Sequence, residues 1–201
     1  MVSVWSPPTR LVAGIEVPAV GTWAIDPDHA YVGFSARRLA VASIRGRFAA
    51  VLGQVNVAEE LSDSSVEAII ATASVASGSG DRDDQLRSAE HLDVDRHPTA
   101  VFRSTHTRWN GRRGLVIGQL TLVGVTNTVE FQVVYRGTVV DPWGAHRSVF
   151  SAGGVINRDD WGVSWNVTLE GGGLLVSRHI GIEIEVETIR RPPSRAEHRR
   201  T

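Results

Sequence analysis

Residues 174–189 read LLVSRHIGIEIEVETI, and this stretch carries the clearest two-residue alternation in the chain. The apolar side chains that fall on every second position are Ile180, Ile182, Ile184 and Val186. The carboxylates between them are Glu183, Glu185 and Glu187. Because successive side chains of a strand point to opposite faces, the pattern predicts a β-strand with one buried face and one face in water.

Similar patterns recur at short spacing along the rest of the chain. The other predicted strands are 32–37, 43–57 with Gly53 near a turn, 66–75, 100–109, 113–124, 129–140 and 147–157. Asn110-Gly111 is a strong hairpin signal, and a second hairpin turn is expected around Val125-Thr126-Asn127. Many short strands joined by tight turns favour an all-β sandwich or barrel.

One segment is typical of a helix. DRDDQLRSAEHL (81–92) begins with Asp81, which can cap a helix, and Asp83 and Asp84 suit the positive end of the helix dipole. We therefore expect one helix inserted among the strands. The final segment, 190–201, is polar and interrupted by prolines, and is expected to be a disordered basic tail.

Composition narrows the class of protein. A chain of 201 residues is most simply one domain, and its net charge of −1 gives no general attraction to nucleic acid. All 21 basic residues are arginine and there is no cysteine, so a disulfide framework and a thiolate nucleophile are excluded. No apolar run is long enough for a membrane span or a signal peptide. We therefore expect a cytoplasmic protein that does not insert stably into a membrane.

HLDVDRH (91–97) invites a metal-site interpretation, because His91, Asp93, Asp95 and His97 fall on every second residue. On an extended strand, however, His91 and His97 would lie about 20 Å apart, too far to share one ion. If the helix runs through Leu92, the alternation no longer describes a common face. We therefore predict no metal site here and expect a helix end, a connecting loop and a strand entry.

Motifs for catalysis are also missing. The chain has no G-x-S-x-G elbow and no P-loop. Asp28-His29 could form part of an acid–base pair, but DPDH (26–29) is equally a turn that enters a strand. We predict no catalytic residues.

If the strands close into a barrel, the inward faces line a core or a cavity that can hold one small ligand. In the first predicted strand, Val32, Phe34, Ala36 and Arg38 share one face. Arg38 could lie at a cavity mouth and pair with an anionic head group, or it could lie past the strand end in solvent. The strand pattern leaves both readings open.

Several stretches together resemble the YceI-like family. They occur in the family's order over roughly residues 20–188: GTWAIDPDHAYVGFSARRL (21–39), IRGRF (44–48), DDQLRSAEHLDVDRHPTAVFRS (83–104), GQLTLVGVTNTVEFQV (118–133), INRDDWGVSW (156–165) and GGLLVSRHIGIEIEVE (172–187). The combination is specific, although no single piece is.

The resemblance implies an all-β, antiparallel, lipocalin-like β-barrel of about eight strands, with the inserted helix at about 81–92 and a long apolar tunnel. It implies a barrel domain over residues 20–189, an N-terminal extension over 1–19 and a tail over 190–201. It further implies binding of a polyisoprenoid or related long-chain lipid, no other cofactor, and often a homodimer. Relatives commonly have histidine at the position of Arg38, and many carry a secretory signal that we do not expect here.

The leading hypothesis is a non-catalytic lipid carrier or storage protein whose tunnel holds an isoprenoid chain, such as a polyprenyl phosphate or a quinone. The side chains expected to line the tunnel are Phe34, Phe48, Phe102, Leu120, Phe131, Ile156 and Trp165, with Arg38 as head-group contact. A second hypothesis is a barrel enzyme acting on a lipid, as an isomerase or hydrolase, with His29 or His106 as acid or base. A third is a stress-response interaction module with a filled core and no ligand.

Overall fold

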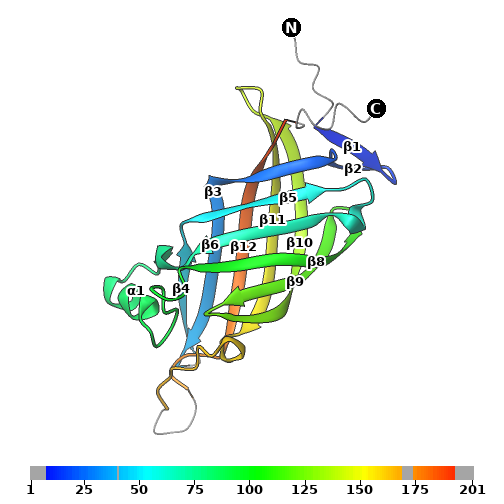
Figure 1. Cartoon of the computed structure of the whole chain (residues 1–201). Coiled ribbons are helices and arrows are strands. Elements are labelled where there is room, and N and C mark those ends of the chain that lie inside the picture. Colours follow the sequence, from blue (N-terminus) through cyan, green and yellow to red (C-terminus); the bar gives the residue numbers. More distant parts are fainter. Residues whose placement is uncertain (1–7, 40, 169–173, 193–201) are drawn as a thin grey trace.

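The protein is a closed antiparallel barrel with one helix, which confirms the predicted fold class (Figure 1). The computed structural model describes residues 8–39, 41–168 and 174–192. Within these ranges each barrel strand pairs with the next, and the last pairs back onto the first to close the ring. The eight strands around the ring are β3 (Gly21–Arg38), β5 (Val51–Val57), β6 (Ser65–Ala71), β8 (Thr99–Asn110), β9 (Arg113–Leu122), β10 (Val125–Val140), β11 (His146–Asn157) and β12 (His179–Arg190).

The long strand β3 takes two partners on one side. Its first residues pair with β5, and its last residues pair with β4 (Ala42–Phe48). A single strand over 43–57 was expected, but the structure has two strands, β4 and β5, separated by residues 49–50. Gly53 lies inside β5 and not at a turn. β7 (Val75–Ala76) extends the sheet beyond β4.

The predicted strand 66–75 is wrong at its end. β6 stops at Ala71 because the next residue turns away to the segment before β8. The hydroxyl of Thr72 donates to the carbonyl of His97 at 2.7 Å, and its amide donates to the carbonyl of Pro98 at 3.0 Å. A short 3-10 helix, η2 (Thr72–Ser74), occupies this corner. The predicted start of the last strand at 174 is also wrong, because β12 begins at His179 and residues 174–178 make only isolated bridges.

Two hairpins follow the expected pairing, but only one has its turn where expected. The turn residues after β8 are Gly111 and Arg112, next to the predicted Asn110-Gly111. The turn between β9 and β10 is Val123-Gly124, with φ of 49° and 74°, whereas 125–127 belong to β10. Glycine adopts positive φ without steric cost, which favours a tight turn at this point over one at the polar residues that follow.

The helix α1 (Gly80–Arg87) is shorter than the predicted 81–92. Its N-cap is Ser79 and not Asp81, and the chain leaves the helical conformation at Ser88, with ψ of 165°. From there to 97 the chain runs through turns held by its own backbone bonds; the amides of Arg96 and His97 both donate to the carbonyl of Asp93. Figure 1 shows α1 at the side of the barrel, next to β4.

The barrel alternates as the sequence predicted, with apolar side chains inward and charged side chains outward. Two clusters of buried residues follow one another inside it. One contains Phe102, Val116, Val129, Phe131, Trp161 and Val163. The other contains Ile25, Tyr135, Phe150 and Val186. Near the second cluster a buried polar layer joins the hydroxyls of Tyr135, Thr138 and Ser148.

The remaining elements lie at the ends of the barrel. Residues expected to form an extension over 1–19 include a two-stranded sheet, β1 (Thr9–Val12) and β2 (Ile15–Pro18), near the end of β12 (Figure 1). The other 3-10 helices are η1 (Leu61–Asp63) and η3 (Arg158–Trp161). The predicted disordered tail 190–201 begins too early, because Arg190 is the last residue of β12. Residues 1–7 and 193–201 lie outside the described residues. None of the described helices is both long and apolar enough to cross a bilayer.

Candidate functional site: an apolar cavity with a basic end

The interior of the barrel contains a cavity of about 610 Å³. This is within the usual range for sites that hold a small organic ligand. The structure brings all eight side chains selected from the sequence into its wall: Phe34, Arg38, Phe48, Phe102, Leu120, Phe131, Ile156 and Trp165. A cavity of this size is not what the filled-core hypothesis predicts. Whether these eight contact a ligand stays a prediction.

Most of the wall is apolar because the inward positions of the strands are apolar. On β6, for example, Val66, Ala68 and Ile70 line the cavity, while Glu67 and Ile69 do not. Aromatic rings pack against each other along the wall. The centroids of Phe34 and Phe48 are 5.7 Å apart, and those of Phe102 and Phe131 are 5.6 Å apart. Burial of a hydrocarbon chain against such a surface is favourable, because it removes apolar area from water.

The ionisable side chains of the wall belong to one end of the barrel. They are Arg38, Asp81, Arg82, His91 and Arg158. Arg38 ends β3, Arg158 follows β11, and the other three lie on α1 or in the turns after it. Arg38 and Asp81 are exposed to solvent, so the cavity opens between the end of β3 and α1. The opposite end is closed by the cluster around Tyr135 and Phe150.

Arg158 is a cavity residue that was not predicted from the sequence. It is 8% exposed, and its guanidinium donates to the carbonyls of Ser177 at 3.2 Å, Val163 and Trp165 at 3.0 Å. These bonds tie the start of η3 to the chain segment that closes this end. A signal was present, because Arg158 continues the inward alternation of β11 two residues after Ile156.

The two histidines of HLDVDRH lie in different surroundings. His91 lies in the cavity wall, with its ring centroid 5.2 Å from that of Trp165. His97 instead lies against the turn at Gly124, where an added Cβ would stand 2.8 Å from its ring. The two histidines therefore serve separate contacts. Burial lowers the pKa of His91, and the positive charge of Arg158 lowers it further.

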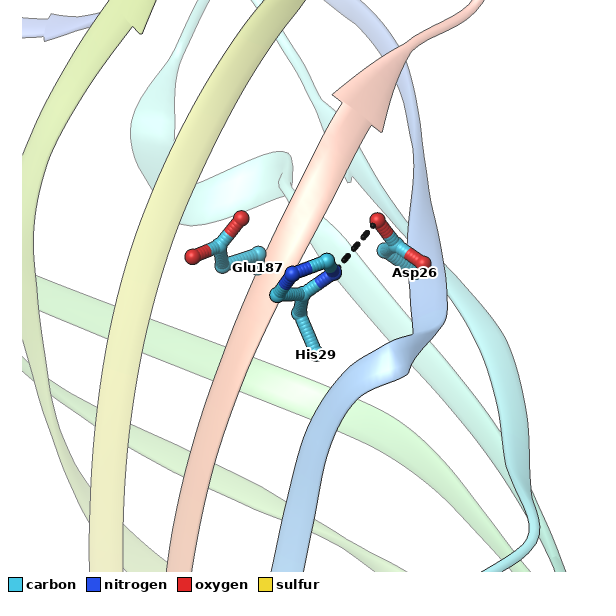
Figure 2. Close-up of side chains that lie close together, drawn as sticks. All are labelled: Asp26, His29 and Glu187. Atoms are coloured by element: carbon cyan, nitrogen blue, oxygen red, sulfur yellow. Dashed lines mark hydrogen bonds and ion pairs between the residues drawn. The ribbon is translucent and has the colours of Figure 1, made fainter.

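A second group of polar residues lies at DPDH, which is a bulge inside β3 and not a turn before it. Residues 26–29 lie opposite the single residue Glu187 of β12. Possible ligand atoms of Asp26, His29 and Glu187 come within 4.8 Å of one another. Figure 2 shows the three side chains. His29 Nδ1 is 3.0 Å from Asp26 Oδ2.

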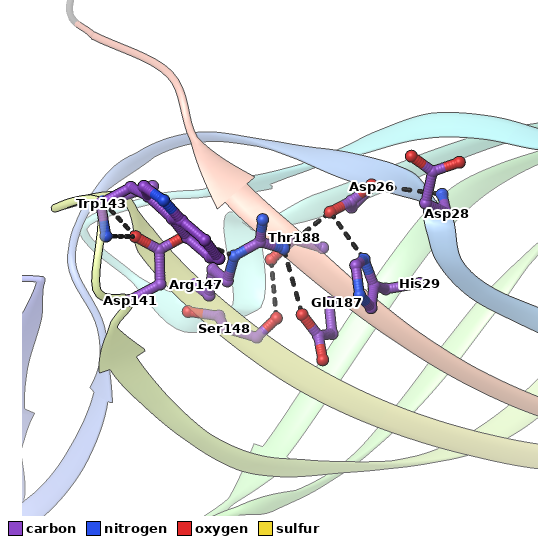
Figure 3. Close-up of polar contacts among 10 residues, drawn as sticks. Asp26, Asp28, His29, Asp141, Trp143, Arg147, Ser148, Glu187 and Thr188 are labelled. Atoms are coloured by element: carbon purple, nitrogen blue, oxygen red, sulfur yellow. Dashed lines mark hydrogen bonds and ion pairs between the residues drawn. The ribbon is translucent and has the colours of Figure 1, made fainter.

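The guanidinium of Arg147 already lies between the carboxylates of this group, where a metal ion would bind. Arg147 Nη1 is 2.6 Å from Asp26 Oδ2 and 3.1 Å from Glu187 Oε2, and its Nε is 2.9 Å from Asp141 Oδ2 (Figure 3). The hydrogen bond from Arg147 holds the pKa of Asp26 below its usual range, and the same donor lowers the pKa of Asp141. The cluster is a salt-bridge network that closes the bulge, and a metal ion would have to displace the guanidinium.

The histidines of the enzyme hypothesis do not reach the cavity. His29 is half exposed in the bulge, and His106 is exposed beside an irregularity in β8. Neither contributes to the wall. An acid or base acting on a lipid inside the barrel would have to be another residue.

Comparisons with known proteins agree with this architecture. The sequence profile of the YceI-like domain matches residues 23–188. A UPF0312 protein of Serratia proteamaculans is 37% identical over 137 residues, covering 68% of this chain and 71% of the relative. A UPF0312 protein of Pectobacterium carotovorum is 34% identical over 179 residues, covering 89% and 90%.

Two solved structures share the fold. BcnA of Burkholderia cenocepacia superposes with a TM-score of 0.70 at 20% identity, covering 81% of this chain and 98% of that one. A protein of Saccharophagus degradans described as a polyisoprenoid binding domain gives a TM-score of 0.65 at 13% identity, covering 84% and 98%.

Proposed function

The chain belongs to the YceI-like family, and from this premise we propose that it binds a long-chain isoprenoid or related amphipathic lipid inside the barrel, as a carrier or storage protein. The observation that carries the proposal is the cavity of about 610 Å³, which is apolar over most of its wall and has its ionisable side chains at its open end. A lipid with one polar head group and one long hydrocarbon chain would place the chain against the apolar wall and the head group at the open end. The Saccharophagus protein of the same fold, described as a polyisoprenoid binding domain, is consistent with it.

The volume of the cavity gives the scale of the chain that it encloses. At about 30 Å³ for each carbon, the volume that a water molecule takes in the liquid, the cavity of about 610 Å³ corresponds to about twenty carbon atoms, roughly four isoprene units. Each buried methylene contributes about 0.8 kcal/mol of transfer free energy. The hydrocarbon chain can therefore supply most of the affinity, and the barrel needs few polar contacts with it.

The test is to extract the purified protein with organic solvent and identify lipids by mass spectrometry. Geranylgeraniol is then titrated into the delipidated protein by calorimetry. We expect an extracted isoprenoid or other long-chain lipid, and saturable binding of about one geranylgeraniol per chain. An extract without lipid, together with no binding of any prenyl lipid, would contradict the proposal.

A further inference from the structure

Arg158 carries a buried positive charge that has no carboxylate partner in the part of the chain that the structure describes. Its three hydrogen bonds all go to neutral backbone carbonyls, and no ion pair within 4.0 Å involves it. Burial lowers the pKa of Arg158 more than the charge of its neighbour Asp159 raises it, and the Asp159 carboxylate itself is paired with Arg178 at 3.0 Å. A guanidinium removed from water without a carboxylate in contact is unfavourable, so this site favours a ligand that brings a negative charge.

Two nitrogen atoms at this end have no hydrogen-bond partner. They are Nη2 of Arg158 and Nδ1 of His91, both shielded from water. The two side chains meet at Trp165, since His91 packs on its ring and Arg158 donates to its carbonyl. The large majority of buried side-chain polar atoms have a partner, so two unpaired nitrogens beside one residue are unusual. A third unpaired nitrogen of the wall, Nε1 of Trp109, lies apart from them on β8.

The other ionisable side chains of the wall also favour a negatively charged ligand. Arg38 and Arg82 add two guanidinium groups, and Asp81 is the single carboxylate among the wall residues described. Asp81 is exposed at the opening, whereas Arg158 is buried. The guanidinium of Arg82 is turned toward Ser77, with Nε 2.8 Å from its hydroxyl. Arg158 is therefore the cation best placed to meet a head group inside the cavity.

We propose that Arg158 and His91 form a receptor for a compact oxyanion, a carboxylate or a phosphate, at the head of the lipid. This inference rests on the proposed lipid binding and adds the class of head group to it. The oxyanion accepts hydrogen bonds from Arg158 Nη2 and from the ring of His91, and the chain extends past Ala68 toward Phe150. A neutral alcohol or quinone head leaves the guanidinium charge uncompensated. Because both nitrogens lie under neighbouring side chains, the entering head group displaces those side chains.

The experiment compares lipids with one chain and different heads: geranylgeraniol, geranylgeranoic acid and geranylgeranyl phosphate, each titrated into the delipidated full chain. We expect the acid, the phosphate or both to bind roughly ten- to a hundredfold more tightly than the alcohol, the gain typical of hydrogen bonds to a charged group. Equal affinity for all three overturns the inference and leaves the proposed function standing. Binding of none of them contradicts the proposed function itself.

Variants locate the receptor. Arg158→Gln should abolish the preference for the anionic heads while the alcohol still binds, which also shows that the variant is folded. His91→Leu, which removes none of the hydrogen bonds made by Arg158, should reduce the preference severalfold. Arg45→Gln, an exposed residue of β4 outside the cavity, is the charge-matched control and should keep the preference. If Arg38→Gln removes the preference and His91→Leu does not, the head group sits at the mouth and the inference is wrong.

Discussion

Ala68 offers a direct test of how far the lipid chain extends into the barrel. It lies on β6, lines the cavity, and packs against both clusters of buried residues. It therefore marks the middle of the cavity, between the basic end and the closed end. Ala68→Phe places a ring across the path of the chain, between the two clusters, and changes neither Arg158 nor His91.

The expected effect follows from the volumes. The phenyl ring adds about six carbon atoms, or about 180 Å³ at about 30 Å³ each, close to a third of the cavity. A chain of about twenty carbons then loses room for about six, and at about 0.8 kcal/mol for each carbon left in water the loss reaches up to about 5 kcal/mol. Geranylgeraniol should bind up to a few thousandfold more weakly, at about 1.4 kcal/mol for each factor of ten. Geraniol, with half as many carbons, fits beside the ring and should bind as before.

Calorimetric titration of the two alcohols into wild type and variant measures this difference. Ile69→Phe is the matched control, because Ile69 is the next residue of the same strand, is 37% exposed and is not part of the cavity wall. Thermal unfolding checks that both variants are folded. If Ala68→Phe binds geranylgeraniol as tightly as wild type, the chain does not pass Ala68 and the orientation proposed for the lipid is incorrect.

Two further predictions concern stability. Arg147→Met should lower the melting temperature at pH 7, and the difference from wild type should shrink as the pH falls below 3.8. The reason is that the pKa of Asp26 in the folded protein lies below its ordinary value of 3.8. The ion pair with Asp26 therefore stabilises the fold fully above pH 3.8, and this stabilisation is lost as the pH falls through the folded pKa. A difference that is constant from pH 7 to pH 2 in thermal scans would contradict this. Gly124→Ala should destabilise by more than the roughly 1–2 kcal/mol of a left-handed alanine, because its Cβ would also stand 2.8 Å from the ring of His97. Gly144→Ala, with φ of 87° and no atom within 4 Å of its Cβ, is the control in urea denaturation; equal losses would refute the contact with His97.

The inward and outward faces of the strands could be predicted from sequence because they follow a local rule. Alternation with a period of two assigns each strand residue to one face, whatever its partner is. By this rule Phe34 and Ala36 of β3 share the inward face, and both lie in the cavity wall. Two residues after Ile156, the same alternation would place Arg158 on the inward face. A charged residue at a strand end is normally assigned to solvent, however, so Arg158 was not predicted to lie inside.

The positions of chain reversals and of the helix end were predicted less well. The turn after β9 uses Val123-Gly124 and not 125–127, and α1 stops at Arg87. Besides their own backbone bonds, residues 88–97 make contacts with distant elements, such as His97 with Gly124 and His91 with Trp165. Such contacts outweigh local propensity, which differs between ordinary residues by less than about 1 kcal/mol.

The sequence by itself therefore determined the strands, their buried faces and the apolar character of the interior, because these depend on residues a few positions apart. Only the tertiary structure decided which charges lie inside and which are paired. Arg147 meets Asp26 from a position 121 residues away, which turns an apparent ligand cluster into a salt-bridge network. Arg158, by contrast, is closed into the barrel end with no carboxylate partner among the described residues. The energy of a charge depends on its distance from every other charge and from water, and barrel closure sets those distances.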